Sequence, residues 1–291
     1  GASGLMAAYD LSQKGKQVII LEASNRLGGR IHTTIDPSFS QSIELGAEFI
    51  HGDMMLTLSL LKEAHTNYYE TKGKMLHLEK GKFKKQNDFD HWDDLMERMS
   101  GLKEDLPLAE FLIKFFNDEK YKNLRESVRH FAEGFDLADP LNASTIALYK
   151  EWKEEWGPQY RIDGGYQQVI DHLAAQCKKK GCIIHTNCCV KKINWRKNEI
   201  SILTMCSQYF EASKVVLTVP ISVLQVQENN LGYIEFAPAI SRYTEAAKQI
   251  GFGTIIKIIL QFDECFWNET KKDAGFFLNK EKIPSWWSKL P

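Results

Sequence analysis

Gly1-Ala-Ser-Gly4 leads directly into Leu5-Met-Ala-Ala-Tyr-Asp-Leu-Ser-Gln-Lys14, and beyond Gly15 the chain continues as Lys16-Gln-Val-Ile-Ile-Leu-Glu22. The middle stretch consists mostly of good helix formers, and the last is an apolar, β-branched run typical of a buried parallel strand. Glycines before a helix let the backbone approach a phosphate, and an acidic residue about 20 positions later binds ribose hydroxyls. The stretch therefore predicts a dinucleotide-binding α/β domain.

A second glycine loop follows the predicted strand. Leu21-Glu-Ala-Ser-Asn-Arg-Leu-Gly-Gly-Arg30 places two adjacent glycines between two arginines. Because glycines carry no side chain, such a loop can bring guanidinium groups close to a phosphate. The sequence therefore predicts a second phosphate contact at this loop.

This second loop resembles the E-A-x-x-R-x-G-G-R signature of the flavin-containing amine oxidase superfamily. That superfamily includes monoamine oxidases, polyamine oxidases and flavin-type histone lysine demethylases. The resemblance covers nearly the whole chain and is most specific over residues 1–52 and 211–267. It implies an FAD cofactor bound by Gly1, Ser3, Gly4, Glu22, Ala23, Gly28, Gly29, Arg30, Gly46, Ala47, Glu48, Phe49 and Val190. Ser24 departs from the pattern, since many relatives have arginine there, and this leaves part of the cofactor anchoring in doubt.

Three later segments extend the resemblance. Ile43-Glu-Leu-Gly-Ala-Glu-Phe-Ile-His-Gly52 is similar to the strand and loop that pass the flavin ring in this family. Val215-Val-Leu-Thr-Val-Pro220 is similar to the strand and proline that end its middle flavin segment. Gly253-Thr-Ile-Ile-Lys-Ile-Ile-Leu-Gln-Phe262, followed by Phe266-Trp267, resembles a substrate-domain strand that carries a lysine.

That lysine, Lys257, is the first candidate catalytic residue. An alternating strand would place it on one face with Ile255, Ile259 and Gln261. On the pattern alone, the alternative is a lysine on an edge strand that reaches water. The resemblance favours catalysis, because the family's matching lysine points at the flavin and holds a water near the reactive nitrogen N5. Neighbouring isoleucines are expected to shield the side chain from water.

His51 is the second candidate catalytic residue. It follows Glu48 by three positions, and Ile-His-Gly is closer to polyamine oxidases than to monoamine oxidases. The alternative is a surface or capping histidine. Glu48 either steers a cationic amine or closes a local hydrogen bond. The acidic stretches 88–94 and 151–156 either attract polyamines or form solvated helix ends.

The alternation of helical and strand patterns predicts an α/β, or mixed α+β, fold with interleaved domains. The pattern predicts a hairpin over residues 74–83, a strand over residues 214–218, and helices over residues 90–101, 108–116, 123–131 and 145–156. Resemblance to the family implies a Rossmann-like FAD-binding domain of residues 1–52 and 160–227, and a helical, mixed-sheet substrate-binding domain of residues 53–159 and 228–291. No strand precedes Gly1, and nothing after Lys257 is similar to the family's last flavin-binding segment. We therefore expect this chain to be an internal piece of a longer enzyme.

Composition narrows the possible functions. The net charge of −1 argues against a nucleic-acid surface, and no apolar run approaches the ~20 residues of a membrane helix. The six cysteines show no metal-binding spacing, so we expect no metal site, and free thiols in a reducing, cytoplasmic compartment.

The resemblance implies oxidation of an amine, by hydride transfer from its α-carbon to flavin N5. The imine is then hydrolysed, and dioxygen takes the electrons to give hydrogen peroxide. The expected partners are thus a small-molecule amine and dioxygen. Two alternatives stay open from the sequence: a related FAD enzyme that acts on carbon–carbon bonds or porphyrinogens, and a non-catalytic interaction module with the same fold.

Overall fold

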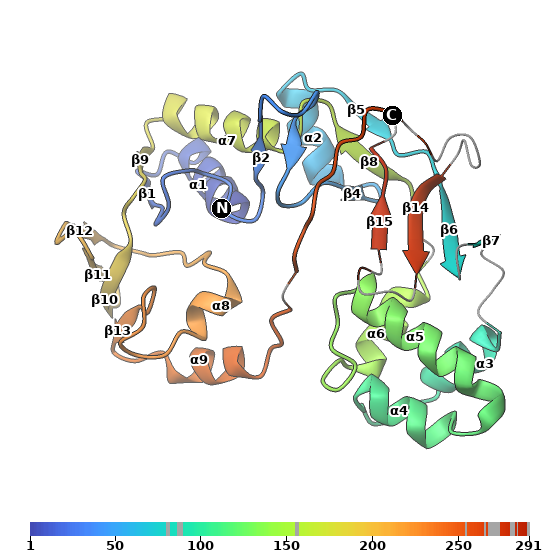
Figure 1. The fold of residues 1–291 in the computed structure, drawn as a ribbon. Helices are drawn as coiled ribbons and strands as arrows, with labels where there is room; N and C mark the ends of the chain where they lie inside the picture. The colour runs from blue at the N-terminus through green and yellow to red at the C-terminus, as the bar shows by residue number, and fades with distance from the viewer. Residues whose placement is uncertain are drawn as a thin grey trace. The chain divides into compact units, whose positions relative to one another are not determined.

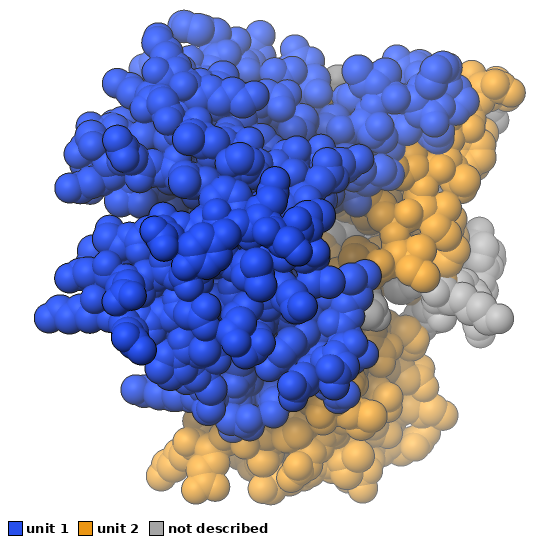
Figure 2. Space-filling model, turned by 90° about the vertical axis from the view of Figure 1, so that its left-hand side faces the viewer, with its two compact units in different colours: residues 1–68, 161–252 blue, residues 69–160, 253–291 orange. Residues whose placement is uncertain are grey.

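A computed structural model describes residues 1–79, 82–85, 90–154, 157–253, 255–264, 266, 274–279, 283 and 285–289. The chain forms two compact units (Figure 2). Unit 1 comprises residues 1–68 and 161–252, and unit 2 comprises residues 69–160 and 253–291. Unit 1 thus includes residues 53–68 and 228–252, which the sequence analysis assigns to the substrate-binding domain. The functional assignment of the predicted domains stays a prediction.

Unit 1 contains the predicted nucleotide-binding elements (Figure 1). Its helices are α1 (Ala2–Gln13), α2 (Met55–Glu63), α7 (Gln167–Lys179), α8 (Ile221–Leu224) and α9 (Ser241–Lys248). Its strands include β1 (Ile19–Leu21), β2 (Thr33–Thr34), β3 (Ile43–Glu44), β4 (Ile50–His51), β9 (Ile183–His185), β10 (Val190–Arg196), β11 (Glu199–Thr204), β12 (Tyr209–Ala212) and β13 (Glu235–Ala237). Strands β5 (Tyr68–Glu70) and β8 (Gln159–Ile162) contain the boundaries between the units and form a sheet of order β4-β8-β5.

Helices α1 and α7 pack together beside the parallel pair β1–β9. Helix α7 buries Ile170, Leu173 and Cys177, which recur at the three- and four-residue spacing that defines one helix face. Leu5 and Ala8 of α1 are also buried. Gly15 closes the end of α1: its N–H donates to Ser12 O and that of Lys16 to Leu11 O, which is the paired bonding of a Schellman motif.

Unit 2 combines a helical bundle with a sheet of order β15-β14-β6-β7. The helical elements are α3 (Trp92–Ser100), α4 (Leu108–Phe115), the 3-10 turn η1 (Glu119–Tyr121), α5 (Lys122–Gly134) and α6 (Thr145–Trp152). The strands are β6 (Lys74–Glu79), β7 (Lys82–Lys85), β14 (Ala274–Asn279) and β15 (Ser285–Trp287). Strands β6 and β7 pair antiparallel, which confirms the predicted hairpin. Helix α5 buries Leu124, Val128 and Ala132 at successive i, i+4 positions, as expected for an amphipathic helix.

One predicted helix end and two predicted strands differ from the structure. The helix predicted from Thr145 ends at Trp152, and residues 155–156 of that prediction lie outside the described residues. Residues 214–218, predicted as a strand, form no regular secondary structure. The described residues of the predicted lysine strand, 255–264, do not form one either; Thr254 and Trp267 lie outside the described residues. A strand requires a hydrogen-bonded neighbour, and neither segment is paired with a strand among the residues that the structure describes.

Asp136 is a half-buried carboxylic acid beside the helical bundle of unit 2. Its Oδ2 accepts a hydrogen bond from the indole N–H of Trp152 at 2.9 Å, whereas its buried Oδ1 meets no donor among the described residues. The pKa of Asp136 is raised to about 6, because burial and, less strongly, the nearby charge of Glu151 outweigh the lowering effect of the Trp152 hydrogen bond. The folded state therefore holds this proton more tightly than the unfolded state does.

The Asp136→Asn variant should consequently be more stable than the parent protein at about pH 7, by about 1 kcal/mol after allowing for solvent screening. The contribution of Asp136 to stability is fully present below the unfolded pKa of about 3.9 and is lost as the pH rises through about 6. The difference between the two proteins should therefore vanish at about pH 4. Thermal unfolding across this pH range measures it, with Glu133→Gln on the exposed surface of α5 as the control. A variant equally or less stable at about pH 7 would contradict the prediction.

Candidate cofactor site

The carboxylate of Glu22 is fixed at the end of β1. Its Oε1 accepts hydrogen bonds from the Ser24 N–H and the Ser24 hydroxyl, each at 3.0 Å. Its Oε2 lies 3.4 Å from the Gly1 nitrogen. Burial alone would raise the pKa of Glu22, but the lowering contributions, led by the hydrogen bonds from Ser24, outweigh it, so the net shift is downward. Glu22 is thus an ionised acceptor at neutral pH, suited to ribose hydroxyls. Ser24, which departs from the family pattern, orients this carboxylate.

The first turn of α1 begins at the same place. Leu5 is the first residue whose N–H bonds within the helix, to Gly1 O, so the N–H groups of Ala2, Ser3 and Gly4 have no intrahelical acceptor. Thr218 closes the other side, because a Cβ added to Gly4 would lie 2.8 Å from its hydroxyl oxygen. A side chain at position 4 would therefore have to displace the Thr218 hydroxyl. Thr218 was not predicted as a site residue, although it lies within the family-like segment 215–220.

The glycine loop of residues 27–30 presents further donors beside Gly1. A Cβ added to Gly29 would lie 3.2 Å from Gly1 Cα, so the two glycine loops are in contact. Among the residues that the structure describes, the N–H groups of residues 27–30 have no hydrogen-bond acceptor. The side chain of Arg30 is exposed. Two sets of N–H groups and one carboxylate thus converge, which are the donors that a pyrophosphate requires and the acceptor that a ribose requires, and the exposed Arg30 ends the glycine loop. These residues fit the FAD that the family resemblance implies.

Cys188 connects the strand bearing Val190 to this site. Its N–H donates to Glu22 O at 2.8 Å, and the N–H of Asn187 donates to Ser24 O at 2.8 Å. Val190 begins β10 and is half-buried. Ala23, by contrast, is exposed. The predicted cofactor residues from the start of the chain and from β10 are therefore brought together in unit 1.

The segment predicted to pass the flavin ring is held by two contacts. A Cβ on Gly46 would collide with the carbonyl of Arg30, so any side chain at this position would separate residues 45–47 from the glycine loop. Glu44, just before it, is buried and accepts hydrogen bonds from the Thr33 hydroxyl at 2.8 Å and the Tyr166 N–H at 2.6 Å. Glu44 thereby connects this segment to the start of α7. It was not predicted as a site residue.

Glu48 forms a buried ion pair. Its Oε1 lies 3.0 Å from an Arg161 nitrogen, and the two side chains are only 9% and 3% exposed. The guanidinium of Arg161 also lies 4.7 Å from the ring centroid of Phe49. The negative charge of Glu48 is therefore balanced within the protein. Arg161 was missed from the sequence, although an arginine between Tyr160 and Ile162 in an apolar strand is itself a signal of a buried partner.

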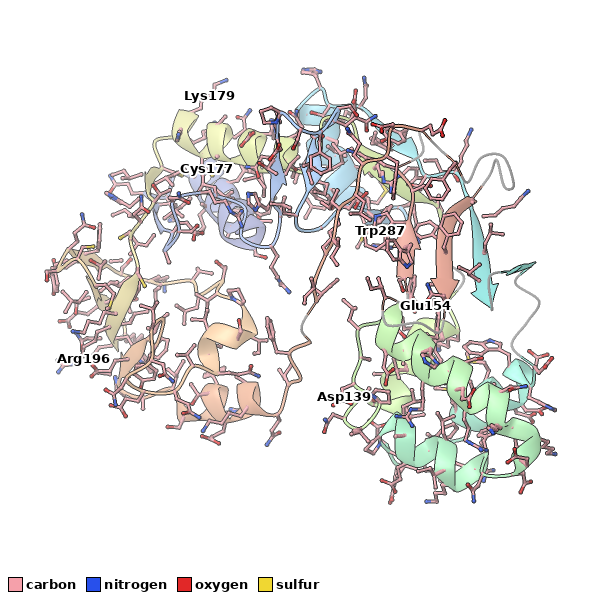
Figure 3. The ribbon with its side chains drawn as sticks, in the orientation of Figure 1. Asp139, Glu154, Cys177, Lys179, Arg196 and Trp287 are labelled. Carbon is pink, nitrogen blue, oxygen red and sulfur yellow. The ribbon has the colours of Figure 1, made fainter. Side chains whose placement is uncertain are left out.

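His51 lies exposed on β4, with its ring centroid 6.1 Å from that of Phe49. Lys257 is half-buried, while among its isoleucine neighbours Ile256 is 87% exposed and Ile255 and Ile258 are nearly 60% exposed; their shielding of Lys257 stays a prediction. The Lys257 ammonium lies 5.3 Å from the ring centroid of Trp287, labelled on β15 in Figure 3. The catalytic roles of His51 and Lys257 stay predictions.

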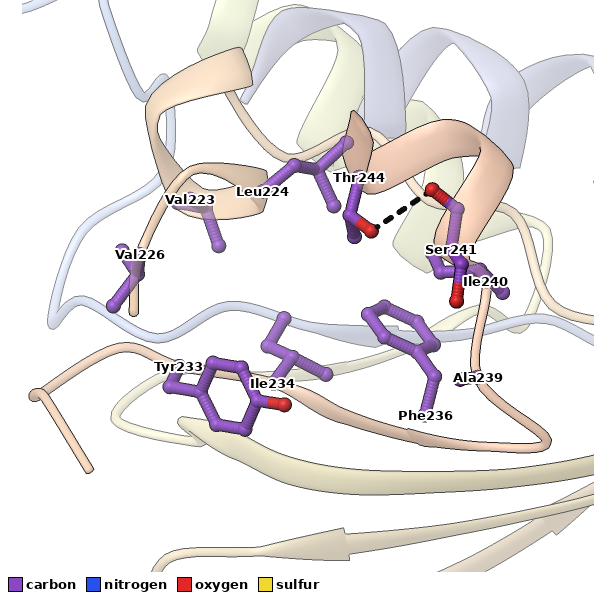
Figure 4. A pocket seen from close by; sticks show the side chains of 10 residues that line it. All are labelled: Val223, Leu224, Val226, Tyr233, Ile234, Phe236, Ala239, Ile240, Ser241 and Thr244. Atoms are coloured by element: carbon purple, nitrogen blue, oxygen red, sulfur yellow. Dashed lines mark hydrogen bonds between the residues drawn. The ribbon is translucent and has the colours of Figure 1, made fainter. Parts of the chain in front are cut away.

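A separate apolar cavity of about 200 Å³ lies between α8, β13 and α9 (Figure 4). Val223, Tyr233 and Phe236 line it, and the Thr244 hydroxyl at its edge donates to Ser241 O at 3.2 Å. None of the predicted site residues lines this cavity. The described residues contain no group of three metal-ligating side chains and no helix long and apolar enough to cross a bilayer.

Comparison with known proteins bears on this site. A family model described as flavin containing amine oxidoreductase matches residues 2–289. Lysine-specific histone demethylase 2 of Homo sapiens is 28% identical over 309 residues, which cover 95% of this chain and 35% of that protein. Polyamine oxidase 2 of Arabidopsis thaliana is 28% identical over 324 residues, which cover 97% of this chain and 63% of that protein.

Solved structures are similar over the same range. A putrescine oxidase bound to putrescine superposes with a TM-score of 0.76 at 20% identity, covering 99% of this chain and 70% of that one. Cyclohexylamine oxidase from Brevibacterium oxydans gives a TM-score of 0.72 at 16% identity, covering 97% and 68%. These similarities confirm the predicted fold class. The chain spans about a third of the demethylase and less than two thirds of the plant oxidase.

Proposed function

Because this chain belongs to the flavin-containing amine oxidoreductase family and its cofactor is FAD, we propose that the protein oxidises amines. The substrate is a polyamine or monoamine, the first product an imine, and dioxygen is the final electron acceptor, giving hydrogen peroxide. The polyamine oxidase and putrescine oxidase relatives support this substrate class. Bound FAD supplies the chemistry, since it accepts two electrons from the carbon next to the amine nitrogen.

The observation that carries the proposal is the convergence at the start of α1. Glu22 would accept hydrogen bonds from the ribose hydroxyls. The N–H groups of residues 27–30 and of the first turn of α1 would donate hydrogen bonds to the phosphates. Arg30 adds a cation for them. In the proposed enzyme, Lys257 holds a water for the reaction and His51 contacts the amine. The cytoplasmic location expected from the cysteines is part of the same proposal.

A second candidate substrate is the methylated side chain of a lysine in a peptide. The similarity to lysine-specific histone demethylase 2, which covers 95% of this chain, supports this second substrate class. Both substrates are amines with a hydrogen on the carbon next to nitrogen, so the same cofactor chemistry applies to either.

The test is peroxide release by the full protein on a panel of polyamines, monoamines, L-amino acids and a methyl-lysine peptide. Peroxide from polyamines is the expected result. Peroxide from the peptide alone would select the second substrate. Bound oxidised FAD without peroxide on any amine would contradict amine oxidation, and would favour an enzyme acting on carbon–carbon bonds or a non-catalytic module.

A further inference from the structure

Arg26 lies at the centre of the glycine loop, where its guanidinium binds backbone carbonyls. Its Nη2 donates to Gly29 O at 2.7 Å. Its Nη1 donates to Ile31 O at 3.0 Å and lies 3.4 Å from Leu27 O. A single guanidinium thus contacts the carbonyls of residues 27, 29 and 31, which is every second residue. A guanidinium is suited to this because its donors are fixed in direction within one plane.

The remaining carbonyls of residues 27–32 are also occupied. Gly28 O accepts from the Ile31 N–H at 3.1 Å, Arg30 O from the Ala47 N–H at 3.1 Å, and His32 O from the Leu45 N–H at 2.8 Å. All six carbonyls of the segment therefore accept hydrogen bonds from the protein. An anion that approaches the loop can therefore bind its N–H groups, because the negative partial charges of the neighbouring carbonyl oxygens are already offset by hydrogen bonds.

The backbone at Gly28 makes this arrangement possible. Its φ is +114°, and an added Cβ would lie 2.6 Å from Ile31 O and 3.5 Å from the Arg26 Nη1. A side chain here would therefore displace the carbonyl that Arg26 binds. Along residues 27–30, carbonyls bound by Arg26 alternate with N–H groups that have no acceptor among the described residues. This is the pattern of a backbone anion site.

We propose that Arg26 is a positioning residue: it gathers the carbonyls of residues 27, 29 and 31 and so shapes the backbone that receives the FAD phosphates, while Arg30 supplies the cation for them. This inference rests on the proposed function, and it separates two arginines that the motif alone treats as equivalent. Arg26 acts through geometry, and Arg30 acts through charge.

Lysine substitution distinguishes the two roles. Arg26→Lys keeps the charge but cannot span three carbonyls with one nitrogen, so it should weaken FAD binding about as much as Arg26→Met, by roughly 10- to 100-fold. Arg30→Lys should retain most of the affinity. Arg30→Met should lose affinity and also flatten the dependence of affinity on salt, because it removes an exposed charge. The Arg26 variants should keep the parent's salt dependence. FAD fluorescence titrations over a salt series measure all four.

A second measurement needs no cofactor. Hydrogen exchange of the apo-protein should be faster in residues 24–34 of both Arg26 variants and unchanged in Arg30→Met. If an Arg26 variant does not fold, Gly28→Ala tests the same turn with Arg26 intact and should weaken FAD binding similarly. Arg26→Lys that binds FAD like the parent, or Arg26→Met with a flattened salt dependence, would overturn the inference. A parent protein that binds no FAD would instead contradict the proposed function.

Discussion

Replacing Lys257 with methionine should slow amine oxidation by roughly 100-fold, the scale at which a positioned proton-handling group contributes. The FAD content should stay close to that of the parent. The residues that fit FAD lie in unit 1, whereas Lys257 belongs to unit 2, so the cofactor contacts described above do not depend on it. The variant therefore separates the chemistry from cofactor binding.

The position of Lys257 supports this choice of substitution. Its ammonium lies over the Trp287 ring, where a cation–π contact restricts a long, flexible side chain. Methionine keeps the unbranched shape and can contact the same ring through its sulfur, but it carries no charge. The change therefore removes the ammonium with little disturbance of packing.

Anaerobic rates of flavin bleaching by the amine, and the rate of reoxidation on adding oxygen, measure the effect. Lys248→Met is the matched control, since that lysine is exposed on α9 and, among the residues that the structure describes, forms an ion pair only with Glu245. Turnover of Lys257→Met equal to that of the control would remove Lys257 from the catalytic site. Loss of FAD from Lys257→Met would show a structural role instead.

Replacing Arg161 with methionine should lower the free energy of unfolding by about 3–5 kcal/mol, because it leaves the buried carboxylate of Glu48 without its cation. This ion pair differs from a surface pair, because the Glu48 side chain is only 9% exposed and the remaining charge would be poorly solvated. The Phe49 ring loses its cation–π contact in the same variant. We also expect weaker FAD binding, since Glu48 and Phe49 belong to the predicted flavin-facing segment.

Urea unfolding measures the loss, with Lys248→Met again as the control; that exposed pair should contribute no more than about 1 kcal/mol. Adding Glu48→Gln to Arg161→Met should recover part of the stability, because the orphaned charge is then absent. A single variant as stable as the control would show that Glu48 is solvated. A double variant less stable than the single one would show that packing, and not charge, dominates.

Much of the local structure could be predicted from the sequence. The glycines, the helix expected after Gly4, which the structure begins at Ala2, and the strand ending at Leu21 were identified because their signals come from near neighbours in the chain. The helices of unit 2 and the β6–β7 hairpin were identified for the same reason. Helical periodicity and turn chemistry are properties of a few consecutive residues. The resemblance, carried by the same short motifs, correctly predicted the family and FAD.

Only the tertiary structure decided how single side chains are used. Arg26 and Arg30 look alike in the motif, but one binds three carbonyls and the other is exposed. The charge of Glu48 meets Arg161, which lies far away in the sequence, and the ammonium of Lys257 lies over the ring of Trp287. The strands predicted at 214–218 and from residue 254 failed for the same physical reason. A strand, an ion pair or a cation–π contact requires a partner from elsewhere in the chain, and a local pattern carries no information about which partner folding brings to it.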